Sequence, residues 1–314
     1  MKKFILNSFI FICLLLLSIC LLLILPPTPR SKNALIFAEI KKDSLLINTE
    51  QPRIIFVGGS NVSFGLDSQK IKDLLNINPI NTAIIYSLGL KYMLDNTYQY
   101  IKKGDIVVLM PEYQHFFQEF DFGSEELLRT VIDVNKSKIK LLNCKQILAC
   151  SPFIPKLISS KFKISEYKYK RKESLVYPVD LFNMYGDFYT HWDSDKMNPD
   201  VYYVHDVLNE NQYNHKTMKK LKKYEEMYNK KGAKFYISYP SLQETYFNNN
   251  IEAINKVEKE LIEFNFIKLG NPERYRMNDF LMYDTVYHLN KKGVDIRTQL
   301  LIEDLKDVHN DFVQ

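Results

Sequence analysis

Strand-like runs alternate with helix-like stretches from Arg53 onward, and this alternation limits the possible folds more than any other feature of the sequence. Apolar runs rich in β-branched and aromatic residues predict strands at 53–57, 81–86, 106–110, 234–239 and 266–269. Amphipathic patterns predict helices that end at Leu75 and near Lys103, and further helices at 213–231, 250–264 and 295–309. Strands joined through helices form parallel sheets, so we expect an α/β fold.

An apolar segment from Phe4 to Leu25 precedes this region and follows two lysines. A helix of this length, at about 1.5 Å rise per residue, crosses a hydrocarbon core of roughly 30 Å. A cleaved signal peptide is the alternative, but the segment is longer than a usual signal core and ends in Pro-Pro-Thr-Pro without a small-residue cleavage site. We therefore predict one uncleaved transmembrane helix. Its signal-like layout places the C-terminal domain outside the cytoplasm.

The chain of 314 residues is long enough for an anchor and one large domain. We divide it into an anchor at 1–25, a tether at 26–52 and an α/β domain at 53–314. Between about 119 and 211 the alternation gives way to aromatic, lysine-rich and proline-punctuated sequence, which we interpret as an insertion or lid. Its Tyr185, Tyr189 and Trp192 either stack on sugar rings or pack against their own domain.

Composition and spacing argue against several classes of protein. The net charge is +5 and the lysines are mixed with acidic residues, so we expect no nucleic-acid surface. The glycines form no nucleotide phosphate loop. His191, Asp193, His205 and Asp206 match no metal-ligand spacing, and we expect neither a metal nor a cofactor. Cys144 and Cys150 form either a small-loop disulfide or two free thiols.

A candidate nucleophile follows the first predicted strand. Glycines at 58 and 59 allow a tight strand-to-helix turn that exposes the Ser60 hydroxyl at the carboxyl end of the sheet, although such a sequence also occurs in ordinary turns. A nucleophilic serine needs a base. Of the six histidines, only His288 has an acid, Asp284, close by in a short loop before the last helix.

These motifs resemble the SGNH/GDSL hydrolase superfamily: Gly-Gly-Ser-Asn at 58–61, Gly89 after the second strand, and Asp284 to His288 followed by Leu-Asn. The resemblance runs from Arg53 to the C-terminus, and is to membrane-anchored members that act on cell-envelope polymers beside a membrane-bound O-acyltransferase. It implies a three-layer α/β/α sandwich with a mainly parallel, flavodoxin-like sheet. It also implies that Ser60 is the nucleophile, His288 the base, and the amides of Ser60 and Gly89 the oxyanion hole.

The sequence departs from the family pattern in two places. The family acid lies three residues before the histidine, whereas Asp284 lies four before His288; Asp279 is the reserve candidate. The family's third block carries an asparagine that donates to the oxyanion, whereas this chain has Met-Pro-Glu-Tyr at 110–113. We expect Asn61 or Tyr113 to replace that donor, and Asn61, Glu112 and Tyr113 to contact substrate.

We therefore expect a membrane-anchored, extracytoplasmic serine esterase or O-acyltransferase. Its substrate would be an acylated cell-envelope polysaccharide or a related glycan, attacked through an acyl-serine intermediate. The resemblance implies a membrane-bound O-acyltransferase as partner. The alternative is a non-catalytic binding or scaffolding component of an envelope polymer modification or export machine, which the missing asparagine favours.

Overall fold

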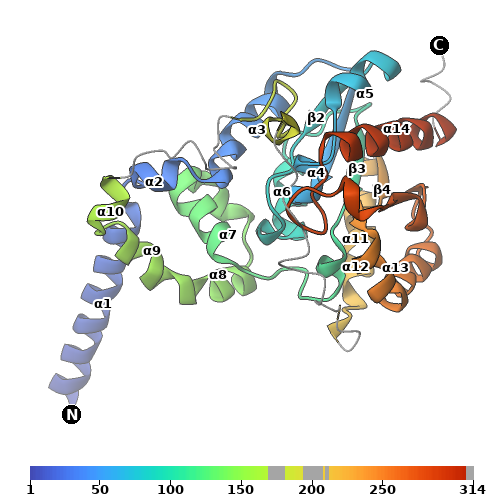
Figure 1. Ribbon diagram of the computed structural model, residues 1–314. Coiled ribbons are helices and arrows are strands. Elements are labelled where there is room, and N and C mark those ends of the chain that lie inside the picture. The colour runs from blue at the N-terminus through green and yellow to red at the C-terminus, as the bar shows by residue number, and fades with distance from the viewer. Residues whose placement is uncertain (169–180, 194–207, 209–211, 309–314) are drawn as a thin grey trace.

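A computed structural model describes residues 1–168, 181–193, 208 and 212–308 (Figure 1). Its central sheet has five strands in the order β2-β1-β3-β4-β6, and every neighbouring pair is parallel. The strands are β1 (Arg53–Gly58), β2 (Asn78–Asn81), β3 (Ile106–Met110), β4 (Lys234–Ser238) and β6 (Lys268–Leu269). Two short strands, β5 (Leu242–Gln243) and β7 (Arg276–Met277), form a second parallel pair. The predicted α/β fold with a parallel sheet is confirmed.

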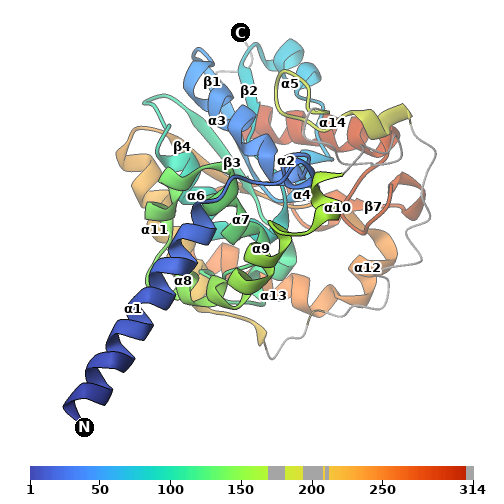
Figure 2. The same cartoon turned by 90° about the vertical axis from the view of Figure 1, so that its left-hand side faces the viewer.

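Both faces of the sheet are buried, as expected for parallel strands whose sequences are apolar without a break. Successive residues of a strand point to opposite faces of the sheet. Ile55 and Val107 pack into the hydrophobic cluster on one face, and their chain neighbours Ile54 and Val108 pack into the cluster on the other face. The first face is covered by α3 (Ala38–Asn48), α6 (Leu90–Tyr98), α11 (Lys216–Lys230) and α13 (Ile251–Glu263). The other face is covered by α5 (Ser68–Leu75) and α14 (Lys291–Val308) (Figure 2).

The second strand ends where it was expected to begin. Asn81 is the last residue of β2 to pair with β1, opposite Phe56. Thr82 then donates both its N–H (3.0 Å) and its hydroxyl (2.8 Å) to the carbonyl of Phe56, and the Asn81 side chain accepts the N–H of Ala83 at 3.1 Å. These local bonds turn the chain out of the sheet. The apolar residues after Thr82 therefore fill the core without forming a strand.

The helices follow the sequence pattern with shifted ends. The α5 helix begins after Asp67, whose side chain accepts the N–H of Lys70 at 3.2 Å, so Asp67 is the N-cap. The α6 helix ends five residues before the expected boundary, and α14 begins at Lys291 instead of 295. A short helix that the pattern did not predict, α12 (Glu244–Asn249), precedes α13.

The segment expected to be a tether is folded. It forms α2 (Pro29–Lys32), a 3₁₀ helix at Leu35–Phe37, and α3, and Ile36 and Leu46 are buried in the core. The buried face of α3 also carries charged residues: Glu39 accepts hydrogen bonds from Tyr92 at 2.5 Å and from Lys138 at 2.6 Å. This partly polar face explains why α3 lacks the apolar periodicity of a core helix.

The insertion is mostly helical up to residue 168, and its described segment at 181–193 contains an antiparallel bridge between Phe182 and Phe188. Residues 169–180, 194–207 and 209–211 lie outside the described part. Its helices are α7 (Glu125–Arg129), a π-helical turn at Thr130–Val134, a 3₁₀ helix at Lys136–Leu141, α8 (Cys144–Cys150), α9 (Ile154–Ser160) and α10 (Ile164–Tyr167). Both thiols of α8 are free, and Cys144 is exposed while Cys150 is buried. Of these helices, α9 contacts the N-terminal helix (Figures 1 and 2).

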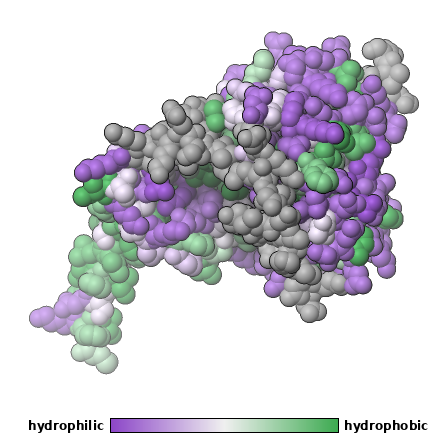
Figure 3. Space-filling model, viewed as in Figure 1, coloured by the Kyte–Doolittle hydropathy of each residue, from purple (hydrophilic) through white to green (hydrophobic). Residues whose placement is uncertain are grey.

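That N-terminal helix, α1 (Lys2–Ile24), is long and apolar enough to span a membrane by its length and composition, a test that signal sequences also pass. None of its residues is buried in the protein. It projects from the folded part as a hydrophobic rod (Figure 3). Among the described residues, α1 is the one helix that passes this test of length and composition.

Candidate active site at the carboxyl ends of β1 and β3

The sheet has a topological switch point between β1 and β3. The chain leaves β1 to form β2 on one side and later returns to form β3 on the other side. Open α/β sheets bind ligands at such a point, beyond the carboxyl ends of the strands. Ser60 follows β1 and Glu112 follows β3 at this edge, so the topology brings together two of the residues that the sequence singled out.

Ser60 is the first residue of α4 (Ser60–Ser63) and is partly exposed. The turn before it requires glycine, because a Cβ on Gly59 would lie 2.6 Å from Glu112 Oε1 and 2.9 Å from the Tyr86 Cα. The Ser60 hydroxyl donates a long hydrogen bond, 3.5 Å, to Glu112 Oε1. The tight turn therefore presents the hydroxyl to a buried carboxyl group.

Glu112 belongs to a buried network that Asn61 connects to Arg297. Glu112 Oε1 accepts the backbone N–H of Asn61 at 3.2 Å and its side-chain amide at 3.3 Å. Arg297, which is fully buried, donates to the Asn61 carbonyl at 2.5 Å and to its Oδ1 at 3.2 Å. Asn61 was expected to contact substrate, but these internal bonds occupy its polar groups.

Burial acts on the charges at both ends of this network. It raises the pKa of the Glu112 carboxyl above its ordinary value of 4.5, although the Asn61 N–H groups and the nearby His288 act in the opposite direction. Burial also lowers the pKa of Arg297 to about 10. The guanidinium remains charged at neutral pH, whereas the buried carboxyl is shifted toward its neutral form.

His288 and Asp284 are hydrogen-bonded despite their four-residue spacing: His288 Nδ1 lies 2.7 Å from Asp284 Oδ1. The loop between them is closed by a bond from the Tyr283 N–H to the His288 carbonyl, at 2.8 Å, so the two side chains meet on one side of a tight turn. The reserve acid, Asp279, instead accepts the Thr245 hydroxyl at 2.7 Å. The geometry thus pairs His288 with Asp284.

Phe64 fixes the plane of the His288 ring. The two rings are stacked, with centroids 4.3 Å apart and planes 8° apart, and Phe188 packs on Phe64 with its centroid at 4.3 Å. Phe64 directly follows α4, so the stack holds His288 against the short helix that begins with Ser60. Ser60, Glu112, His288 and Asp284 therefore lie in one neighbourhood.

Sequence reasoning did not identify Phe64 or Arg297. An aromatic residue four positions after the candidate nucleophile was the available signal for Phe64. For Arg297, the signal was an arginine on the apolar face of α14, level with the fully buried Val294 and Leu301. A charged residue at such a position needs buried partners.

Two other predicted site residues, Gly89 and Tyr113, have surroundings that do not match their predicted roles. The Gly89 N–H, expected to help form the oxyanion hole, donates to the Tyr86 carbonyl at 3.0 Å within its own turn, so the predicted role requires that bond to open. Tyr113 is 2% exposed and packs in the core, where burial and the nearby Glu258 and Glu273 raise its pKa. The structure does not bring the Tyr113 side chain to Ser60, because the turn after β3 directs it inward.

The aromatic residues of the insertion mostly pack on their own domain. Tyr185 is buried and its hydroxyl donates to Gln69 at 2.8 Å, and the Lys291 ammonium lies 4.2 Å from the centre of the Trp192 ring. Tyr189 remains 42% exposed. Of these residues, Tyr189 alone presents a substantial face to solvent.

The sequence predicted no metal site at His191, Asp193, His205 and Asp206, and the structure describes only the first two of these residues. His191 Nε2 lies 2.9 Å from the Leu289 carbonyl, and burial lowers its pKa to about 4. His205 and Asp206 lie outside the described residues. Within the described ranges, no group of three or more His, Cys, Asp or Glu side chains could hold a metal ion.

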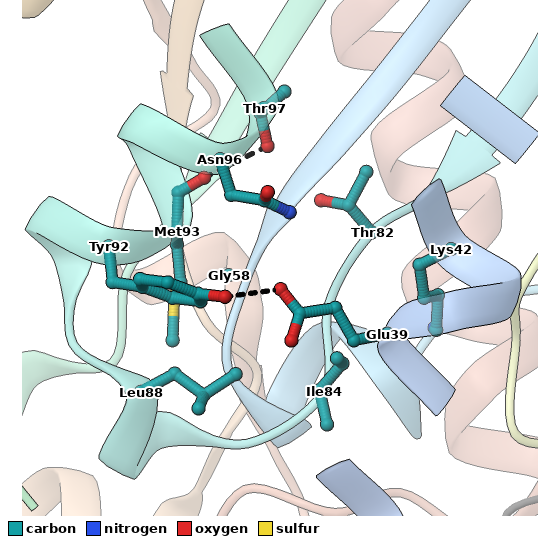
Figure 4. Close-up of a pocket in the computed structure, with 10 residues that line it drawn as sticks. All are labelled: Glu39, Lys42, Gly58, Thr82, Ile84, Leu88, Tyr92, Met93, Asn96 and Thr97. Atoms are coloured by element: carbon teal, nitrogen blue, oxygen red, sulfur yellow. Dashed lines mark hydrogen bonds between the residues drawn. The ribbon is translucent and has the colours of Figure 1, made fainter. Parts of the chain in front are cut away.

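A small cavity lies behind β1, between α3 and α6 (Figure 4). It has a volume of about 20 Å³ and is lined by Gly58, Glu39 and Lys42 among others. A space of this size holds about one water molecule and is too small for a sugar. Burial raises the pKa of Glu39 and lowers that of Lys42 to about 7. The edge of the sheet at Ser60 therefore remains the candidate site, and this cavity does not.

No protein-family model matches this chain, and a search of curated proteins finds no significant match. The functional assignment consequently depends on the geometry of the site.

Proposed function

We propose that the chain is a membrane-anchored, extracytoplasmic serine esterase or O-acyltransferase that acts on an acylated cell-envelope polysaccharide or a related glycan. The observation that carries the proposal is the His288–Asp284 hydrogen bond of 2.7 Å, formed beside the helix that begins with Ser60. A histidine oriented by a carboxylate is the base that an attacking serine requires.

The strand order and the helices on both faces of the sheet support this proposal. Helices pack on both faces of the sheet, and its five strands follow the order second, first, third, fourth, fifth along the chain. This is the flavodoxin-like order of doubly wound sheets. We assign the domain to a three-layer α/β/α sandwich of SGNH type, in which the nucleophile follows the first strand and the base precedes the last helix.

In the proposed reaction, the Asp284 carboxylate accepts a hydrogen bond from the Nδ1–H group of His288, so that Nε2 is unprotonated and acts as the base. Nε2 takes the Ser60 proton while Oγ forms a bond to the ester carbonyl carbon. The tetrahedral intermediate breaks its bond to the alcohol oxygen, and His288 returns the proton to that oxygen. Water or a sugar hydroxyl then attacks the acyl-serine by the same route, which gives hydrolysis or transfer.

Glu112 has a defined part in this proposal. An ionised carboxylate next to Ser60 would repel the oxyanion, whereas a neutral carboxyl group can donate to it. Oε1 already accepts the two N–H groups of Asn61, so the proton belongs on Oε2. Burial, which raises the pKa of this carboxyl, favours the neutral form. Glu112 thereby supplies the donor for which the family uses asparagine.

Fluorophosphonate labelling of the full chain in detergent tests the nucleophile. Intact mass should show one adduct on the wild-type protein, none on Ser60→Ala and slower labelling of His288→Ala. Ser63→Ala is the matched control, because Ser63 lies on the same helical turn and its hydroxyl is buried without a hydrogen-bond partner. Failure of the folded wild-type protein to react would contradict the proposal.

The second candidate function is a non-catalytic component of an envelope polymer modification or export machine. The engaged Gly89 N–H favours it, because that amide donates to Tyr86 and not to a substrate site. The two functions separate in cells that carry Ser60→Ala at wild-type abundance. Loss of polymer acylation or deacylation supports the enzyme, and an unchanged polymer supports the binding component.

A further inference from the structure

The helical segment that contacts α1 through α9 exposes several apolar side chains. Leu148 on α8 is 74% exposed, Phe162 after α9 is 62% exposed, and Ile164 on α10 is 69% exposed. We call these residues, together with Ile147, the α8–α10 surface. The same helices bury Cys150 and Leu157 in the core, so their attachment to the domain does not use the outer face. Large apolar side chains left this exposed within one short segment are candidates for an interaction site.

The charge of this segment is as uneven as its hydrophobicity. Between Asp133 and Glu166 the chain contains seven lysines and no aspartate or glutamate. Lys138 and Lys161 are buried in ion pairs, with Glu39 at 2.6 Å and with Asp133 at 3.0 Å. The others are exposed to solvent. Apolar residues with surrounding lysines are typical of helices that lie in the headgroup region of anionic membranes.

Two of these lysines join the segment to the end of the membrane-spanning candidate. Lys161 Nζ donates to the Leu25 carbonyl at 2.7 Å and to the Leu23 carbonyl at 3.2 Å, and Lys136 Nζ donates to the Ile24 carbonyl at 3.0 Å. They satisfy carbonyl groups that the end of a helix leaves without partners. The junction therefore fixes the segment that carries the α8–α10 surface to the C-terminal end of α1 (Figures 1 and 2).

We propose that the α8–α10 surface is immersed in the same lipid leaflet from which α1 emerges. Its apolar side chains enter the boundary between headgroups and acyl chains, and its exposed lysines bind anionic headgroups. The inference rests on the anchor of the proposed function, because it requires α1 to be in the bilayer. Its consequence is that the domain is held in a fixed orientation on the membrane instead of moving on a tether.

Site-directed spin labelling of the full chain in phosphatidylcholine–phosphatidylglycerol vesicles tests the proposal. Single cysteines replace Leu148, Phe162, Leu16 of α1, or Ile262, in a chain with Cys13, Cys20 and Cys144 changed to serine. Ile262 is the matched control, since it is an apolar residue of α13 that is 56% exposed. The accessibility of each label to oxygen, which concentrates in lipid, is compared with its accessibility to a water-soluble nickel chelate.

We expect oxygen accessibility to exceed chelate accessibility at positions 148, 162 and 16, and the reverse at 262. Lipid-like values at 16 with water-like values at 148 and 162 would overturn the proposal while leaving the anchor intact. Water-like values at all positions would show that α1 is not in the bilayer, and would therefore contradict the predicted anchor as well. Labels at 148 and 162 that are shielded from both reagents would identify a second copy of the chain as the occupant, which also overturns the proposal.

Discussion

Asp284 is the hydrogen-bond partner of His288 Nδ1, at 2.7 Å. Asp284→Asn preserves the size of the side chain, but its NH₂ group can donate to Nδ1 and so favour the tautomer with the proton on Nε2, which cannot act as a base. We expect the rate constant of fluorophosphonate labelling to fall on the order of 10⁴-fold, as carboxylate loss does in catalytic triads. Stopped labelling reactions followed by intact mass measure this rate.

Asp279→Asn is the control for that substitution, because Asp279 lies in the same region of the chain but binds Thr245. Its labelling rate should stay near that of the wild-type protein. Equal losses in the two variants would mean that the bond between His288 and Asp284 has no special role.

Glu112 makes a pH-dependent contribution to stability. Its folded-state pKa is above the ordinary value of 4.5, so the folded protein binds more protons than the unfolded chain between these two values. The contribution is fully present below pH 4.5 and is lost as the pH rises through the folded-state pKa. Glu112→Gln removes this titration and keeps an oxygen that accepts the Asn61 N–H groups.

We therefore expect Glu112→Gln to lose less stability than the wild-type protein between pH 4.5 and about 8. Urea unfolding midpoints at the two pH values give the comparison. Glu263→Gln, at an exposed position with 55% of its side chain accessible, should keep the wild-type difference. Identical pH dependence in all three proteins would refute the burial argument.

The sequence identified residues of the site more readily than their contacts. Ser60 was recognisable from its position after the first strand and two glycines, and His288 from the acid, Asp284, close to it before the last helix. The bond between His288 and Asp284 was not predictable, since it depends on how tightly the 283–288 loop closes. The internal position of Asn61 was also hidden, because its partner Arg297 is 236 residues away along the chain.

At the scale of elements, Arg297 holds α14 against α4. Its guanidinium bonds the backbone and side chain of Asn61, and both residues are fully buried. Arg297→Met leaves those oxygens without donors, and we expect it to lower the free energy of unfolding by about 3 kcal/mol. Urea denaturation measures the change.

Arg276→Met is the matched substitution. Arg276 is half-exposed and pairs with Glu273 at 3.2 Å on the surface, where such pairs contribute about 0–1 kcal/mol. A loss as small for Arg297→Met as for Arg276→Met would show that Asn61 finds other donors.

Elements were predictable where one pattern dominated. The third strand has the predicted bounds because its five residues are all apolar and buried. The second strand was misplaced because the apolar residues after Thr82 have the composition of a strand but lie beyond the turn made by Asn81 and Thr82. Local side-chain bonds, which hydrophobic patterns do not contain, decided this boundary.

At the scale of the whole molecule, the sequence predicted an anchor and a domain but separated them too sharply. The segment at 29–48 belongs to the predicted tether, 26–52, and its charged residues interrupt its apolar periodicity. In the structure those charges are paired across elements, as Glu39 is with Lys138. Glu39 and Lys138 are 99 residues apart along the chain, so the hydrophobic pattern of either segment does not reveal that they pair.

The orientation of the whole molecule gives the last prediction. If the domain is extracytoplasmic, a membrane-impermeant maleimide added to intact spheroplasts should label a cysteine at position 262, in a chain with Cys13, Cys20 and Cys144 changed to serine. Position 262 suits this purpose because it is exposed and lies on α13, away from the α8–α10 surface. The remaining Cys150 is buried and should not react.

The same cells after lysis give the total of reactive cysteine. Labelling of intact spheroplasts to nearly that total places the domain outside, next to the envelope polymers that the proposed reaction needs. Labelling only after lysis would place the domain in the cytoplasm. The lysines between Asp133 and Glu166 would then face the cytoplasmic leaflet, whose anionic lipids also attract basic segments. The α8–α10 surface would keep its lipid partner in that case, whereas the envelope substrate would be excluded.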